Sequence, residues 1–255
     1  MKLTVFASGS TGNCSLVRAG GASVLVDAGI SAKRIREGLA RAGLLPSELD
    51  GIFITHEHSD HIRGLSVLLK KNPVPLYAPG TAAAALVREV PGADVYLRPI
   101  EPEQVTVLGG LRVTAFSTPH DAAGSVGYRF SAADGCLGFA TDTGCVTETM
   151  LRYLSDTDAV LIEANHDVEM LRNGRYPPYL QKRILSDRGH LSNAECTFLA
   201  AVLARRGTKK LVLGHLSKEN NRPGLALETV LRGTEGTDAE VFVAPESGYL
   251  EVAVS

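Results

Sequence analysis

The run Thr-His-Glu-His-Ser-Asp-His at residues 55–61 constrains the fold more than any other stretch of the 255-residue chain. It follows directly on the apolar residues 51–54, whose length and bulk predict a buried strand, so the polar run begins where that strand ends. Loops at strand ends are where α/β folds usually place their chemistry. Three imidazoles and two carboxylates at such a place indicate a metal site, and one short loop of this kind can serve two metals.

The same order, a strand followed by a ligand-type residue, occurs three more times. His120 follows the apolar run 113–116, Asp142 follows 137–141, and His215 follows 210–214. A single pair of histidines is common in solvated loops, but five ligand-type residues within six positions are rarely accidental. Since these residues come from both halves of the chain, the two halves must meet. The chain has seven histidines in all, namely His56, His58, His61, His120, His166, His190 and His215.

The bulk composition predicts one globular domain over residues 1–255. The chain is 44% hydrophobic, which is enough to bury a sizeable core, and we find no Gly/Ser-rich linker and no fixed-period repeat. The first residues lack the features of a signal peptide, and no apolar stretch is long enough to cross a bilayer. The four cysteines lack Cys-x-x-Cys spacing, which favours unpaired thiols in a reducing compartment. We therefore expect a cytoplasmic protein with no membrane segment.

Hydrophobic periodicity predicts strands in both halves, each half flanked by helices. We expect the fold class α/β (α+β), with two mixed sheets face to face and helices on both outer surfaces, an αβ/βα four-layer sandwich. The five strands from 95 to 141 are expected to form an antiparallel meander. The expected strands are 3–7, 15–19, 22–27, 51–55, 74–78, 95–100, 104–108, 111–117, 125–131, 136–141, 159–164 and 210–213, with two more near 241 and 250; the expected helices are 32–42, 62–71, 81–90, 147–154, 177–186, 193–206 and 225–232.

The ligand-type residues divide into two sets of three with one carboxylate between them. His56, His58 and His120 can hold one ion, Asp60, His61 and His215 a second, and Asp142 can bridge the two; Asp60 also counts among the catalytic residues. Imidazole and carboxylate without thiolate suit Zn, Mn, Fe or Co, and ligand type alone does not choose among them. We expect Mn²⁺ or Zn²⁺, with Fe as an option. Two ions about 3.5–4 Å apart activate water at neutral pH and stabilise charge that develops on the substrate, a combination that indicates hydrolysis.

A histidine held by a carboxylate can protonate a leaving oxygen, and Glu163 with His190 is the pair that we predict for this role. Asp27, which follows another buried strand, can orient a ligand histidine or can cap the turn after it. Ser192 is also expected to be an N-cap, since Glu195 stands at capping-box spacing.

The net charge of −2 gives the protein no general attraction for nucleic acid, so a polyanion would need a local basic surface. Residues 172–188 contain five basic residues and one acidic one, which predicts such a surface or, alternatively, a solvated helix face. The turn 8–13 offers backbone amides to an anion but lacks the lysine of a P-loop. His166 can contact substrate phosphate or satisfy a buried hydrogen bond, and the second interpretation is favoured. The predicted substrate-binding residues are Ser10, Asn13, His166, Lys182, Arg183, Ser192, Asn193 and Lys218.

The assembled pattern resembles the metallo-β-lactamase superfamily over the whole chain. The signature His-x-His-x-Asp-His is matched by residues 56–61, and His120, Asp142 and His215 match the later ligands. The strings at 8–14, 163–167, 184–193 and 214–221 resemble the YycJ (WalJ) group of exonucleases within it. This resemblance implies the metallo-β-lactamase fold, two metal ions, and a phosphodiesterase that acts as a 5′-to-3′ exonuclease on single-stranded DNA, with a proposed role in mismatch repair. The tRNA-maturing members carry a carboxylate and a histidine at places similar to Glu163 and His190, but the order of residues around His166 differs from theirs.

Other functions of the superfamily fit less well. β-Lactamases are exported and typically carry a cysteine where this chain has the Asp60-His61 pair. Thioester or lactone hydrolases of the glyoxalase II type share the seven ligands, but the basic insert between Asp142 and His215 favours an anionic substrate. A β-CASP insertion does not fit the length, although an RNA-processing nuclease without it stays open, and a scaffold protein is disfavoured because all seven ligands are present. The residues leave open the native metal, the polarity of digestion, DNA against RNA, and monomer against homodimer.

Overall fold

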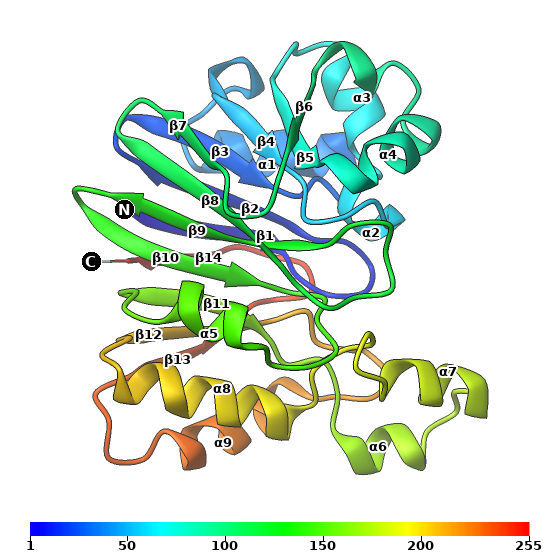
Figure 1. Cartoon of the computed structure of the whole chain (residues 1–255), viewed down its shortest axis with the longest axis vertical. Helices are drawn as coiled ribbons and strands as arrows, with labels where there is room; N and C mark the ends of the chain where they lie inside the picture. The colour runs from blue at the N-terminus through cyan, green and yellow to red at the C-terminus, as the bar shows by residue number, and fades with distance from the viewer. Residues whose placement is uncertain (255) are drawn as a thin grey trace.

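The computed structural model describes residues 1–254, whose strands form two mixed sheets packed face to face (Figure 1). The first sheet has the order β14-β1-β2-β3-β4-β5-β6, and the second has the order β13-β12-β11-β10-β9-β8-β7. The first contains β1 (Lys2–Ala7), β2 (Cys14–Ala19), β3 (Ala22–Val26), β4 (Gly51–Phe53), β5 (Leu76–Pro79), β6 (Leu97–Ile100) and β14 (Leu250–Ala253). The second contains β7 (Val105–Leu108), β8 (Leu111–Ser117), β9 (Val126–Ala132), β10 (Gly135–Ala140), β11 (Ala159–Glu163), β12 (Lys210–Gly214) and β13 (Glu240–Val243).

The pairing directions bring the ligand-bearing loops to one edge. In the first sheet β3, β4, β5 and β6 run parallel, and in the second β10, β11, β12 and β13 do. β8 and β10 each pair antiparallel with β9, so β8 points the same way as β10. The carboxyl ends of parallel strands share one edge of a sheet, which is where α/β folds place their sites.

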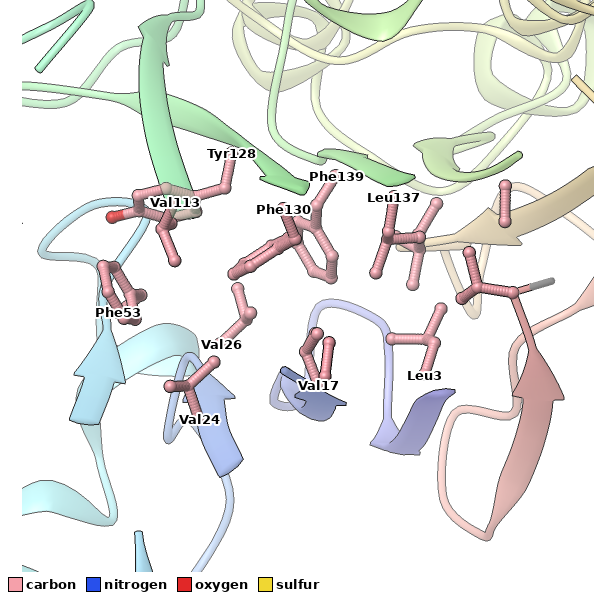
Figure 2. Packing of buried hydrophobic residues seen from close by; sticks show 14 of the residues in the cluster. Leu3, Val17, Val24, Val26, Phe53, Val113, Tyr128, Phe130, Leu137 and Phe139 are labelled. Carbon is pink, nitrogen blue, oxygen red and sulfur yellow. The ribbon is translucent and has the colours of Figure 1, made fainter. Parts of the chain in front are cut away.

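Apolar side chains from both inner faces fill the space between the sheets (Figure 2). Val24, Val26 and Phe53 of the first sheet face Phe130 and Phe139 of the second, and all five are buried. The ring of Phe53 stacks on Tyr77 and meets Tyr128 edge-on, with ring centroids 4.6 and 5.5 Å apart. This core holds the two sheets together behind the ligand-bearing edge.

Helices cover the outer face of each sheet and bury a second and a third apolar layer. Ile35, Leu39 and Leu65 pack on the first sheet, and Leu154 and Leu199 pack on the second. Central strands are therefore buried on both faces, which explains their nearly continuous apolar sequence. The first sheet is covered by α1 (Ala32–Arg41), α3 (Leu65–Leu69) and α4 (Ala83–Glu89), and the second by α5 (Glu148–Leu154), α8 (Asn193–Arg205) and α9 (Pro223–Gly233); α2 (Ser59–Ile62), α6 (Val168–Arg172) and α7 (Pro178–Ile184) lie along the ligand-bearing edge (Figure 1).

The predicted four-layer sandwich is confirmed, and three of its details were wrong. The strand expected at 95–100 is no part of the meander, because β6 pairs parallel with β5 after the crossover through α4, and only β7 to β10 run antiparallel. In place of the helix expected at 62–71 there are two short helices, α2 and α3. They are separated at Gly64, whose amide donates to the Ala28 carbonyl. Helix α6 was not predicted at all. Within residues 1–254 no helix is both long and apolar enough to span a bilayer.

Candidate metal centre

Loops from both sheets place the predicted ligands side by side at the shared edge, with α2 contributed by the first half and α7 by the second (Figure 1). Asp27, Asp142 and His215 stand directly after or next to the ends of β3, β10 and β12, and all three have left-handed backbone, with φ of 60, 55 and 53°. Asp and His tolerate this region better than most residues, but it remains unfavourable away from glycine. Three such residues at one site indicate a backbone shaped for the side chains that it presents.

His56, His58 and His120 form the first group, in which one ring nitrogen from each lies within 4.8 Å of the others. The outer nitrogens have partners: His56 Nδ1 lies 3.1 Å from Thr55 Oγ1, and His120 Nδ1 lies 3.1 Å from the Gly189 carbonyl. The Nε2 atoms of His56 and His120 are buried and have no hydrogen-bond partner within the described residues. Each of these two rings is thus fixed from behind and presents a free nitrogen to the group.

Asp60, His61 and His215 form the second group, again within 4.8 Å. Asp60 Oδ2 lies 3.5 Å from His61 Nε2 and 3.6 Å from His215 Nε2. Behind His61, the carboxylate of Asp27 accepts from Nδ1 at 2.8 Å, so the orienting role considered for Asp27 is the one that its contacts support. The Asp27 carboxylate also accepts from the Thr55 amide and hydroxyl, which ties the start of the 55–61 run to β3.

Asp142 lies between the two groups and contacts members of both. Its Oδ2 is 3.3 Å from His61 Nε2, and its Oδ1 is 3.8 Å from His120 Nε2 and 3.5 Å from His215 Nδ1. Only 2% of its side chain is exposed. This is the place that the predicted bridging role requires.

The charges of the centre depend on one another. Burial alone would raise the pKa of Asp142, but His215 and His61 hold the pKa of that carboxyl well below its ordinary value. Burial likewise opposes charge on His61 and His215, yet the carboxylates beside them, with Asp142 common to both, raise both pKa values well above the ordinary one. Burial and the neighbouring His61 lower the pKa of His56. In this arrangement, protons on the histidines balance the negative charge of the carboxylates. Divalent cations can balance the same charge instead.

The residues fit divalent metals. The donors are imidazole and carboxylate, and four buried donor atoms that face the centre have no hydrogen-bond partner in the described chain: Nε2 of His56, His120 and His215, and Oδ2 of Asp142. Unpaired buried polar atoms are costly unless an ion or water satisfies them. Outer partners on the Nδ1 atoms leave Nε2 as the metal-facing nitrogen, which is the usual arrangement for histidine ligands.

The predicted acid pair is formed, and Glu163 does more than predicted. Glu163 Oε1 lies 2.8 Å from His190 Nδ1 and 2.7 Å from His215 Nδ1, while Oε2 accepts from the Thr143 and Leu191 amides at 3.0 and 3.1 Å. Burial would raise the pKa of this fully buried carboxyl, but His190 and His215 lower it to about 2. Opposed by burial, Glu163 nevertheless raises the pKa of His190. One carboxylate therefore holds both the predicted acid, His190, and a predicted ligand, His215.

The predicted substrate-binding residues lie in different surroundings. Ser10 and Arg183 line a pocket beside the centre, with His190 in its wall, while Lys182 and Lys218 are exposed. Asn13 is buried and bonds the Gly9 turn and the Asp60-His61 segment instead of facing solvent. Three others are likewise buried, namely His166, Ser192, which caps α8 with Glu195 as predicted, and Asn193, which bonds Asn221. For Asn13, Ser192 and Asn193, substrate contact stays a prediction beside these structural contacts.

The favoured interpretation of His166, a satisfied buried hydrogen bond, is wrong. Its side chain is 1% exposed, and neither ring nitrogen has a partner in the part of the chain that is described. The neighbouring backbone carries the contacts instead, because the His166 carbonyl accepts from the Asn193 amide at 2.8 Å. A role in substrate binding stays a prediction.

Some residues of the site were not predicted. Thr55 donates to Asp27 and accepts from His56, so the first residue of the 55–61 run belongs to the site as much as its histidines do. Ser8 accepts from the amide of His215, and Asp121 lies 3.4 Å from His120 Nε2 and pairs with Arg183. Gly29 allows the loops to meet, since a Cβ there would overlap the Asp60 carbonyl. Their only sequence signal is adjacency to a ligand or to a strand end.

The fold and the metal-fitting edge define a hydrolase of metallo-β-lactamase architecture. A model of the Beta-lactamase superfamily domain matches residues 22–216, and the chain belongs to this family. It is 40% identical to exodeoxyribonuclease WalJ of Streptococcus pneumoniae, over 95% of this chain and 91% of that protein. It is 39% identical to exodeoxyribonuclease YycJ of Bacillus anthracis, over 90% and 88%. Zinc-bound PqqB of Methylobacterium extorquens has a similar fold, with 20% identity, a TM-score of 0.75 and coverage of 99% and 100%. Matches to ribonuclease Z and hydroxyacylglutathione hydrolase proteins cover about half of the chain.

Proposed function

We propose that this protein is a two-metal phosphodiesterase that removes nucleotides from single-stranded DNA as a 5′-to-3′ exonuclease. The observation that carries the proposal is the similarity to exodeoxyribonucleases along nearly the whole chain. Hydroxyacylglutathione hydrolases and ribonuclease Z match only about half of the chain, so thioester hydrolysis and RNA processing are the less supported alternatives.

In this proposal His56, His58 and His120 hold one divalent ion, Asp60, His61 and His215 hold the other, and Asp142 serves both. The ions supply Lewis-acid activation of water and charge stabilisation at the phosphate. We propose Mn²⁺ or Zn²⁺, with Fe as the further option, since all accept imidazole and carboxylate. Thr55, Asp27 and Glu163 lie against the Nδ1 atoms of His56, His61 and His215, and so orient these rings with Nε2 toward the metals.

His190 is the proposed general acid. Its Nδ1 is committed to Glu163, which leaves Nε2 as the nitrogen that can give a proton to the leaving oxygen. Because His190 lines the pocket and also belongs to a cluster with Asp142 and His215, a phosphodiester in the pocket lies beside both the acid and the metals. Arg183, in the same wall, supplies positive charge for a phosphate.

The test is digestion of end-labelled strands by protein loaded with Mn²⁺ or Zn²⁺, followed by product sizing. We expect a 5′ label to appear at once as the smallest product, and a 3′ label to move through a ladder of shortening strands. Duplex DNA, RNA of the same sequence and a thioester serve as comparison substrates. Failure to shorten single-stranded DNA while the thioester is hydrolysed would refute the proposal. Sedimentation of the same samples decides between monomer and homodimer.

A further inference from the structure

We infer that the pocket beside the metal centre holds the terminal nucleoside of an unpaired strand. Tyr176 is the surface on which its base stacks, and Tyr179, which lies outside the pocket, is a second stacking surface. This rests on the proposed function and deepens it, because it assigns residues to the preference for single strands.

The pocket combines an apolar wall with polar groups at its ends. Tyr176, Leu180 and Ile184, from α7 and the residue pair before it, form the wall, and Ser10 and Ser217 add hydroxyl groups. A nucleoside has this division too, with a flat apolar base and a polar sugar. Stacking on an aromatic ring tolerates any base, which suits an enzyme that must accept every terminal nucleotide.

The position of the pocket relates the base to the chemistry. His190 stands in the pocket wall, and its Nδ1 is 3.8 Å from Asp142 Oδ1. A base seated on Tyr176 therefore leaves its own phosphodiester next to the acid and the metal-binding carboxylate. Arg183 pairs through Nε with Asp121, so its terminal nitrogens stay available to a backbone phosphate.

Outside the pocket, α7 continues as an exposed aromatic and basic face. The side chain of Tyr179 is 76% exposed, and Lys182 and Arg183 follow it at i+3 and i+4, which places the three on one side of the helix. Residues 172–188 carry five basic residues against one acidic residue, a difference of four positive charges, on a chain whose net charge is −2. Aromatic rings among basic side chains beside an anion-cleaving centre match the chemistry of a single strand.

This arrangement selects unpaired ends. The bases of a duplex are already stacked and paired, so reaching Tyr176 and Tyr179 would require the end to fray. Helices α6 and α7 stand out from the body at the same edge as α2, where a strand can approach from outside (Figure 1).

The first test compares four variants of the metal-loaded protein in binding and digestion. Fluorescence anisotropy with a labelled phosphorothioate strand reports binding, and steady-state digestion of ordinary DNA gives KM and kcat. We expect Tyr176→Ala to weaken binding and raise KM roughly ten- to hundredfold, the range for one lost base stack, and Tyr179→Ala to have a smaller effect. Tyr176→Phe keeps the ring and should stay within about threefold of the unmodified protein. Phe198→Ala removes another exposed aromatic, 60% exposed on α8, and should change nothing.

The second test removes the base instead of the ring. A strand with an abasic 5′-terminal nucleotide should bind the unmodified protein as weakly as an intact strand binds Tyr176→Ala, and Tyr176→Ala should not distinguish the two strands. Equal binding of abasic and intact strands by the unmodified protein overturns the inference, even if Tyr176→Ala does not fold.

Hydrolysis of bis(p-nitrophenyl) phosphate separates this inference from the proposed function. The small ester carries no DNA strand, so its hydrolysis by the unmodified protein reports on the metal centre without a terminal nucleoside, and Phe198→Ala should hydrolyse it normally. Normal digestion of DNA with no effect of either tyrosine overturns the pocket assignment alone. Hydrolysis of neither DNA nor the ester by the unmodified protein overturns the proposed function instead.

Discussion

Replacing Glu163 by Gln tests the network behind the metal centre most sharply, because the two side chains have nearly the same shape. The carboxylate is fully buried and accepts four hydrogen bonds, two from histidine rings at Oε1 and two from backbone amides at Oε2. Glutamine has one acceptor oxygen, so in either orientation its NH₂ group faces two donors. Each buried donor left without an acceptor costs about 1–3 kcal/mol, so we expect the free energy of unfolding to fall by about 2–6 kcal/mol.

The metal makes a second contribution. In the metal-free Glu163→Gln variant, His215 can lose the proton on Nδ1, keep the one on Nε2 beside Asp60, and accept from the NH₂ group of the new side chain, which relieves part of that cost. A metal at Nε2 forbids this tautomer, so metal affinity should fall about 10- to 100-fold, the usual effect of losing an outer partner of a ligand histidine.

Urea unfolding of chelated and metal-loaded protein, with metal titration, measures both quantities. Glu169→Gln is the matched control, because it is the same chemical change at a side chain that is 75% exposed, and it should cost less than about 0.5 kcal/mol. A loss under about 1 kcal/mol for Glu163→Gln, together with unchanged metal affinity, would contradict both the four-bond account and the role of Glu163 in orienting His215.

Three further predictions concern charge. Asp142→Asn keeps the shape and tolerates the left-handed backbone, and it should remove metal and activity together; activity at normal metal content would contradict the bridging assignment. Lys182→Ala and Arg183→Ala should each reduce the slope of log affinity for single-stranded DNA against log salt by about 0.7 without changing metal content. An unchanged slope would mean that the two side chains belong to an ordinary solvated helix face. In chelated protein the raised pKa values of His61 and His215 stabilise the fold fully below about pH 6.5, and this stability is lost as the pH rises through those values, so the unfolding temperature should fall toward alkaline pH. Metal-loaded protein should not show this fall, and identical pH profiles would contradict protons as the counter-charge.

The strand positions and the ligand groups could be predicted because both follow from short-range patterns. Apolar runs that end in His or Asp mark buried strands whose ends must share an edge, and the resemblance to a known superfamily supported the grouping made from the residues. The sharing of Glu163 by His190 and His215 could not be predicted, since it depends on β11 lying between β10 and β12 in the sheet. The pairing partner and direction of the strand expected at 95–100 could not be predicted either. The 95–100 run looked like the start of a meander, because alternation along a strand does not reveal which neighbour it pairs with.

The structural partners of polar side chains were harder to predict than the strands and the ligand groups. Asn13 was taken from an exposed-looking Gly/Ser turn, yet its amide side chain lies within the loop that it stabilises. For His166, the favoured buried hydrogen bond was wrong, because a polar residue near a strand end suggested a partner that the fold does not provide within the described residues. Both outcomes depend on how loops from distant parts of the chain pack, which local sequence does not encode.

The position of β14 has a consequence for the order of events during synthesis. This strand is made after all the other strands of the two sheets, yet it pairs with β1, which is made before them. Until it arrives, β1 presents one side of unpaired backbone groups, the condition under which edge strands recruit other chains. His215, the last of the predicted ligands, also lies late in the chain, so the metals can be bound in full only shortly before the first sheet is closed. A nascent chain stalled short of residue 250 should therefore bind metal and still aggregate.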